Sequence, residues 1–138
     1  MKKRMLALAL CACALMATPA PAFAAQVPEE IVSPFMLLIN QTDANLTVSG
    51  ETAKVTASVI GIVGTVTKTE VEAELQVKDG SSWRHVEDWS VSKNSYRASL
   101  SETQAVVEGH TYRVKATVTA WKGTQSESKT IYSGQYIA

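Results

Sequence analysis

Three glutamates at alternating positions, Glu70, Glu72 and Glu74, are the residues best spaced for acid–base chemistry. On a β-strand alternate side chains share one face, and neighbours on that face lie about 6.6–6.8 Å apart. Carboxyl groups at that separation are typical of inverting glycosidases. Such a pair must flank a cleft, however, and a domain of this size has little room for one. Cross-strand ion pairs with Arg113 and Lys115 explain the glutamates more simply, so we expect a solvated face and name no catalytic residue.

The two histidines are the next candidates, because imidazole serves both as a general base and as a metal ligand. His85, followed by Glu87 and Asp88, offers up to three ligands for a surface metal. The chain has no helical histidine pair and no metalloprotease motif. We therefore interpret His85 as a partly exposed strand residue and His110 as a loop residue beside Tyr112, and we expect neither a metal site nor a cofactor.

The N-terminus has the three parts of a signal peptide. A basic run, Lys2-Lys3-Arg4, precedes an apolar stretch over Met5–Met16, and Ala22-Phe23-Ala24 supplies small residues for a peptidase. We predict a signal peptide over residues 1–24, cleaved after Ala24, and release of the remaining chain as a secreted, extracellular protein.

A lipoprotein signal is the alternative, because Leu10-Cys11-Ala12-Cys13 is close to a lipobox and would leave the protein lipid-anchored at Cys13. Cleavage after Ala24 removes both cysteines, leaves about 114 residues and changes the net charge from zero to about −3. A chain without cysteine has no disulfide, thiolate zinc site or cysteine nucleophile. The acidic balance argues against non-specific binding of nucleic acid, which needs a basic face. No later stretch is long and apolar enough to predict a membrane span.

From Ala44 onward, apolar and polar residues alternate in the way that is typical of strands with one buried face. Residues 25–138 contain 15 Val, 13 Thr and 13 Ser, which favours strands over helices. About seven short strands, with a turn signal roughly every 8–12 residues, predict a single all-β antiparallel sandwich that is immunoglobulin- or fibronectin-like. A small β-barrel is the alternative. We assign residues 25–43 to an extended lead-in or first strand and residues 44–138 to the sandwich domain.

Three aromatic residues are expected to have structural roles. Trp83 and Trp89 begin and nearly end one imperfectly alternating strand, in which a bulge between Val86 and Trp89 would turn both of those residues toward the core. Tyr112 lies near the start of the penultimate strand, where it fits a tyrosine corner. We expect its ring to be buried and its hydroxyl to bond back to the preceding loop.

Several short motifs carry a family resemblance: Gly61–Lys68, Gly80–Trp83, Trp89, Tyr112–Val118 and Gly123–Ser128. In their order and spacing they resemble a family of small secreted domains of unknown function, common in Gram-positive gut anaerobes. The match covers about residues 44–133. It implies a bacterial source, secretion and an all-β fold, but no catalytic residue, because the family has no established activity. This chain departs from the pattern at Ile62-Val63, where an aromatic or polar residue is expected, and at Trp121, where a tyrosine is expected.

One surface feature suggests a contact site. In a seven-strand sandwich, the turn after the second strand and the turn after the sixth lie at the same end. Ile62 and Val63 stand between two glycines in the first turn, and alternation places Trp121 outward at the second. We predict an exposed apolar tip built from these three residues, because exposed apolar clusters often mark contact sites. The alternative is that Trp121 folds down as a lid on the end of the sandwich.

These features favour a non-catalytic binding or adhesion module that contacts an extracellular glycan, a wall polymer or a protein. A small secreted hydrolase or a protease-inhibitor-like protein is the alternative. An enzyme needs a pocket that gathers titratable groups. An inhibitor needs a protruding loop, for which we expect only Ser101–Gly109 to be available. A structural unit of an extracellular assembly, joined through edge strands, is the third possibility.

Overall fold

The computed structural model describes residues 37–138. The predicted signal peptide, its predicted cleavage after Ala24 and the alternative anchor at Cys13 lie outside the described residues. The strands are β1 (Ile39–Ser49), β2 (Thr52–Gly61), β3 (Lys68–Asp79), β4 (Ser82–Lys93), β5 (Arg97–Ala105), β6 (Thr111–Lys122), β7 (Gln125–Tyr132) and β8 (Tyr136–Ile137). No helix of the described part is long and apolar enough to cross a membrane.

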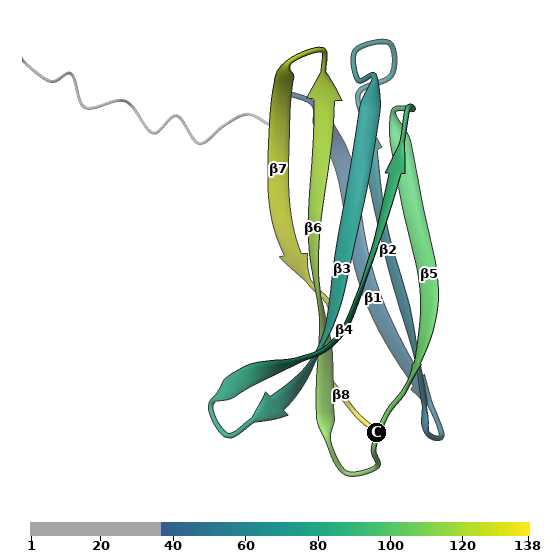
Figure 1. Ribbon diagram of the computed structural model, residues 1–138, viewed down its shortest axis with the longest axis vertical. Helices are drawn as coiled ribbons and strands as arrows, with labels where there is room; N and C mark the ends of the chain where they lie inside the picture. The colour runs from purple at the N-terminus through teal and green to yellow at the C-terminus, as the bar shows by residue number, and fades with distance from the viewer. Residues whose placement is uncertain (1–36) are drawn as a thin grey trace, which may run out of the picture. The chain divides into compact units, whose positions relative to one another are not determined.

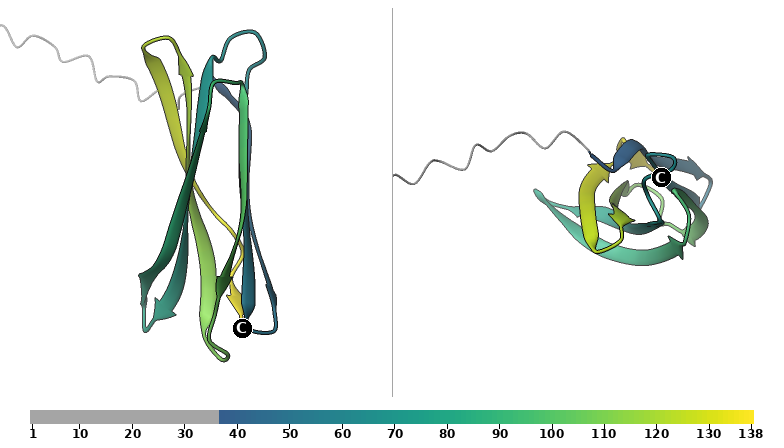
Figure 2. Two further views of the ribbon diagram at one scale, coloured as in Figure 1. Left: turned by 45° about the vertical axis from the view of Figure 1, so that its right-hand side comes forward. Right: turned by 90° about the horizontal axis from the view of Figure 1, so that it is seen from above.

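The strands form two antiparallel sheets packed face to face (Figure 1). The smaller sheet has the order β1-β2-β5, and the larger has the order β4-β3-β6-β7, with the short β8 added beside β6. Backbone pairing does not join the sheets to each other, so the fold is the predicted immunoglobulin/fibronectin-like β-sandwich and not the small barrel. The turns β2–β3, β4–β5 and β6–β7 lie at one end, and β1–β2, β3–β4 and β5–β6 lie at the other (Figures 1 and 2).

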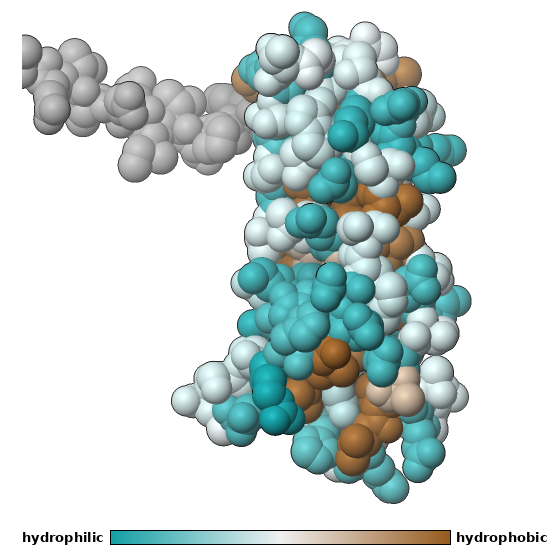
Figure 3. All heavy atoms as spheres, viewed as in Figure 1, coloured by the Kyte–Doolittle hydropathy of each residue, from teal (hydrophilic) through white to brown (hydrophobic). Residues whose placement is uncertain are grey.

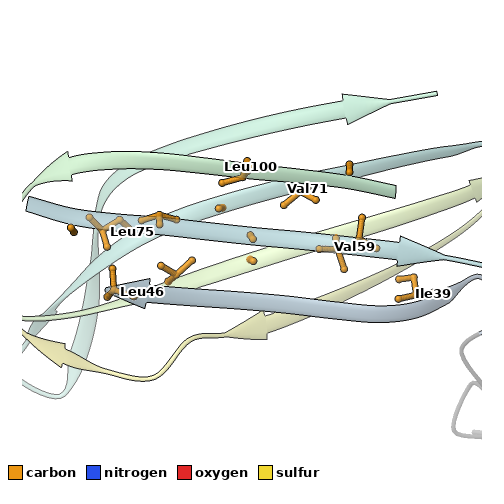
Figure 4. Close-up of a cluster of buried hydrophobic side chains, with 14 of the residues drawn as sticks. Ile39, Leu46, Val59, Val71, Leu75 and Leu100 are labelled. Atoms are coloured by element: carbon orange, nitrogen blue, oxygen red, sulfur yellow. The ribbon is translucent and has the colours of Figure 1, made fainter. Parts of the chain in front are cut away.

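The core lies between the sheets and is built largely by alternation of inward and outward side chains. On β3, Val71, Ala73 and Leu75 are almost fully buried, and the facing strands contribute side chains such as Leu46 and Val59 (Figure 4). Most core side chains are valine or alanine, which suit a thin two-layer interior. One consequence is close packing at Gly61, where an added Cβ would lie 2.7 Å from a methyl carbon of Val66.

Two boundaries differ from the sequence expectation. The first strand begins at Ile39, so the boundary placed between residues 43 and 44 falls inside β1. Strand β5 extends to Ala105, so the expected loop Ser101–Gly109 was wrong, and the connection covers only residues 106–110. Both stretches belong to the outer strands of the smaller sheet. Apart from Ile39, residues there are at least partly exposed on both faces, so the sequence lacks the alternating apolar residues that would predict a strand. The protruding loop that an inhibitor needs is accordingly shorter than expected.

A bulge in β4 determines where its aromatic residues point. The pairing of β3 with β4 shifts between Leu75 and Gln76, which leaves Val86 as the extra residue on β4. Val86 and Trp89 both pack against the core, as predicted, but the bulge lies at Val86 itself and not between Val86 and Trp89. The same bulge reverses the alternation before it. Trp83 therefore lies on the outer face of the larger sheet, over Arg113, and not in the core with Trp89.

The turn before β6 is held by Tyr112. Its side chain is 4% exposed, and its hydroxyl accepts a hydrogen bond from the backbone N–H of Val107 at 2.9 Å. This is the arrangement of a tyrosine corner. It fixes the five-residue connection between β5 and β6 against the end of the sandwich.

Candidate functional site

The outer face of the larger sheet gathers the most chemically versatile side chains of the described residues. Antiparallel register places one residue from each strand side by side across it. One row joins Lys115, Glu74 and Asp88, and the next joins Arg113, Gln76 and His85. In the space-filling view from the same side as Figure 1, most of the surface is polar or of intermediate hydropathy, with apolar patches at mid-height and in the lower part (Figure 3).

Arg113 is the centre of an aromatic stack on this face. Its guanidinium carbon lies 4.1 Å from the centre of the Trp83 ring and 4.5 Å from the centre of the Tyr132 ring. Because β4 and β7 lie on opposite sides of β6, the two rings approach Arg113 from opposite sides. Cation–π contacts of this kind restrict both the cation and the rings. The stack is therefore a preformed, partly exposed aromatic surface.

A chain of polar contacts runs from the stack toward β4. Arg113 Nε donates to Gln76 Oε1 at 2.8 Å, and Gln76 Nε2 donates to Glu74 Oε1 at 3.1 Å. That carboxylate oxygen lies 3.3 Å from His85 Nδ1, and His85 Nε2 lies 3.4 Å from Asp88 Oδ1. Carboxylates only accept hydrogen bonds, so both imidazole contacts are hydrogen bonds only when the ring carries two protons. Gln76 is 8% exposed, and its side-chain oxygen and nitrogen both have hydrogen-bond partners, so no polar atom is left unpaired at the buried end of this series of contacts.

A shallow depression of about 400 Å³ lies beside the stack. It is open to solvent, and its polar lining comes from three strands: Glu72, Glu74, His85, Asp88, Ser90, Lys115 and Thr117. The lining contains hydrogen-bond donors and acceptors in comparable number, and three of its groups are carboxylates. Such a surface can hold a polar ligand by several weak contacts, with aromatic rings close by.

The expected ion pairs between the glutamates and the basic residues of β6 are not made. Glu74 and Lys115 are register partners, yet within residues 37–138 the only ion pairs are those of His85 with Glu74 and Asp88. Arg113 is drawn instead to two aromatic rings and an amide. His85 contacts Asp88 as the metal hypothesis considered, but Glu87 bonds to a neighbouring backbone N–H. Residues 37–138 contain no group of three side chains placed to hold a metal ion.

The structure brings the loops of the predicted apolar tip to one end of the sandwich. Thr67 donates from its backbone N–H to the carbonyl of Trp121 at 2.8 Å, which joins the β2–β3 loop to the end of β6. Ile62 is 39% exposed and Val63 is 70% exposed. Trp121 is half-buried on the outer face, with the Lys68 ammonium 4.6 Å from its ring centre. It therefore points outward, as alternation predicts, and is shielded by Lys68.

Sequence reasoning missed the role of Arg113, Gln76 and Tyr132. The outward position of Arg113 follows from alternation, but the position of Trp83 depends on which residue of β4 is bulged. The one signal available was the imperfect alternation of Trp83–Val91, which indicates a bulge after which side chains of the same parity lie on the opposite face of the sheet. His110 lies in the exposed connection beside Tyr112, where it was expected.

Comparisons with known proteins add little. No family model and no curated protein matches the sequence, so the resemblance to small secreted domains stays a prediction. Among solved structures, the chain is similar to a catalytically inactive OgpA from Akkermansia muciniphila, determined with an O-glycopeptide substrate. The identity is 10%, the TM-score is 0.37, and the match covers 71% of this chain. The chain spans only 31% of that protein.

Proposed function

We propose that this chain is a secreted binding module, and that the outer face of the β4-β3-β6-β7 sheet takes an uncharged extracellular glycan. The observation that carries the proposal is the Trp83–Arg113–Tyr132 stack beside the open depression at Glu74 and Asp88. The proposal stands on this chemistry and not on any likeness to a known protein.

The stack supplies the apolar half of such a site. The faces of sugar rings carry C–H groups that pack on aromatic rings, and Tyr132 is 52% exposed. Because Arg113 holds Trp83 and Tyr132 from between, their orientation does not have to be fixed on binding. Preorganisation of this kind lowers the entropic cost of association.

The depression supplies the polar half. Sugar hydroxyls are both donors and acceptors, and they pair with carboxylates, ammonium groups and other hydroxyls. Glu74 and Asp88 accept, Lys115 donates, and Thr117 and Ser90 do either. These groups lie on rigid strands, so their spacing is set by the sheet.

The charge of the depression favours an uncharged ligand. Glu72, Glu74 and Asp88 line it, and Lys115 is the one lysine or arginine among the lining groups. A sulfated or sialylated glycan would meet this excess of carboxylates and be repelled. Neutral chains bring no such cost.

The test is a printed array of neutral, sialylated and sulfated oligosaccharides, probed with residues 25–138 and with two variants. Tyr132→Ala and Asp88→Ala alter the aromatic and polar halves separately. We expect binding to neutral glycans that falls at least tenfold in both variants. Ser99→Ala, an exposed change on the other sheet, is the matched control and should bind like the parent. Equal binding by all four proteins, or binding only to sulfated chains, contradicts the proposal.

A further inference from the structure

The exposed large apolar residues of the described chain gather at the two ends of the sandwich. Leu37, Ile62 and Val63 lie at the end with the β2–β3 turn, and Val107, Tyr136 and Ile137 lie at the opposite end. Only Tyr132, which belongs to the stack on the outer face, stands apart from these two sets. Contiguous exposed apolar residues at defined places often mark contact surfaces.

At the first end the apolar residues are held in place by backbone hydrogen bonds. The carbonyl of Ile62 accepts from the N–H groups of Thr65 and Val66 at 3.1 Å and 3.0 Å, which closes the turn. The N–H of Ile62 donates to the carbonyl of Leu38 at 2.9 Å, so Leu37 is tied beside the turn. Val66 is buried behind it. The turn therefore presents Val63 as a fixed protrusion.

The opposite end is hollowed. A depression of about 360 Å³ lies there, and its lining residues are Val48, Gly50, Glu51, Glu108, Ile137 and Ala138. Its walls are also held by hydrogen bonds, because Gly109 donates to the carbonyl of Ala138 at 2.8 Å and Ala138 donates to the carbonyl of His110 at 2.9 Å. A small apolar side chain is of the size that this hollow admits.

The two ends carry opposite charge. The first end, residues 60–68, 92–98 and 121–127, contains four basic residues, Lys68, Lys93, Arg97 and Lys122, against one acidic residue, Glu127, whose Oε2 accepts from the Leu38 and Ile39 N–H groups. The hollow at the opposite end is lined by Glu51 and Glu108, and Lys54 is the one basic residue at the start of β2 beside it. Lys78, Asp79 and Arg84 also belong to that end, but they lie on the β3–β4 hairpin, which diverges from the body (Figure 1).

We propose that copies of this chain associate head to tail, with the Val63 turn of one copy seated in the Glu51–Glu108–Ile137 hollow of the next. Val63 would contact the apolar wall of the hollow at Val48 and Ile137, and the basic residues of the first end would face Glu51 and Glu108. The two surfaces lie at opposite ends of the long axis (Figure 2). A contact between unlike surfaces leaves one of each free, so association gives linear chains and no closed dimer. Each contact is small, and its affinity is correspondingly weak.

Linear chains have a consequence for binding, although the inference does not rest on the proposed glycan site. The outer sheet face lies along the side of the sandwich and takes no part in the end-to-end contact. A chain of copies would display this face repeatedly, and repeated weak contacts to one polymer give avidity.

Sedimentation velocity of residues 25–138 over a concentration series tests the inference. We expect the mean mass to rise steadily with concentration and the rise to weaken in high salt, which screens the charged rims. Val63→Asp and Ile137→Asp should each remain monomeric, and Ser99→Asp, on the side of the sandwich, should associate like the parent. Far-UV circular dichroism and thermal unfolding establish that each variant is folded.

Mixing the two blocked variants is the decisive step. Val63→Asp retains a working hollow and Ile137→Asp retains a working turn, so the mixture should form a one-to-one dimer and nothing larger. Three results overturn the inference: a monomer at every concentration, association that neither variant weakens, or blocked variants that fail to combine. The second result would indicate pairing through edge strands instead.

Discussion

The guanidinium carbon of Arg113 lies 4.1 Å from the centre of the Trp83 ring, and the same guanidinium donates from Nε to Gln76 at 2.8 Å. This relationship links an edge strand, a central strand and a nearly buried amide. It holds the aromatic surface in place and leaves Gln76 fully partnered. The outer face of the larger sheet is therefore organised before any ligand binds.

Removing the guanidinium should weaken the sheet measurably. In Arg113→Ala the oxygen of Gln76, which is 8% exposed, loses its donor, and both rings lose their cation. We expect a loss of about 1–3 kcal/mol in the free energy of unfolding in urea. Lys115→Ala, two residues along the same face, is the control and should change stability by no more than about 0.5 kcal/mol. Equal effects would show that the stack has no structural role.

The tyrosine corner predicts a smaller, specific loss. Tyr112→Phe keeps the buried ring and removes the acceptor for the Val107 N–H. We expect a destabilisation of about 1 kcal/mol, together with faster hydrogen exchange at the Val107 amide. Tyr132→Phe is the control: it removes the hydroxyl of an exposed tyrosine in the same way and should leave the free energy of unfolding unaltered. Unchanged exchange at Val107 would mean that the hydroxyl does not hold the loop.

Close packing at Gly61 predicts a steric effect. An added Cβ would lie 2.7–2.9 Å from three atoms of Val66, and Val66 is itself buried. Gly61→Ala should cost about 1–3 kcal/mol in a chemical-denaturation measurement. Val66→Ala in the same chain makes room, so the double variant should be less destabilised than the sum of the two single changes. Additive effects would contradict this account.

Glu127 connects the two sheets, and its removal should loosen the start of β1. Its Oε2 accepts from the backbone N–H groups of Leu38 and Ile39 at 2.6 Å and 3.1 Å. In Glu127→Ala we expect faster hydrogen exchange at both amides and a loss of about 1.5–3 kcal/mol, because bonds to charged groups are the stronger ones. Gln125→Ala, exposed on the same strand, serves as control. Protection that persists in Glu127→Ala would show that another group anchors β1.

The sequence predicted the architecture because alternation is strong where one face is buried. Strand β3 shows this clearly, with Val71, Ala73 and Leu75 inside and glutamates outside. The pattern fails at the edges, where a polar run follows Ile39 in β1 and β5 continues through Ser101. The turns between strands were predicted correctly where a glycine adopts a positive φ, as at Gly80 and Gly123.

The candidate site was less accessible to sequence reasoning. The exposure of Ile62 and Val63 follows from their place between two glycines, and it could be predicted. The stack could not, because one bulged residue, Val86, decides which face Trp83 joins. Pairing Arg113 with glutamates was reasonable from charge alone. It was wrong because the rings of Trp83 and Tyr132 and the amide of Gln76 satisfy the guanidinium in this geometry.

The most direct test of the central claim is a map of amide and indole NMR shifts on titrating residues 25–138 with a neutral oligosaccharide that binds on the array. The account predicts that the perturbed signals belong to the outer face of the larger sheet: the Trp83 indole, Gln76, His85, Arg113 and Lys115. Signals at Val63 and Val107, at the two ends, should not move. Perturbations confined to either end, or to β1, β2 and β5, would contradict the claim that this face binds the ligand.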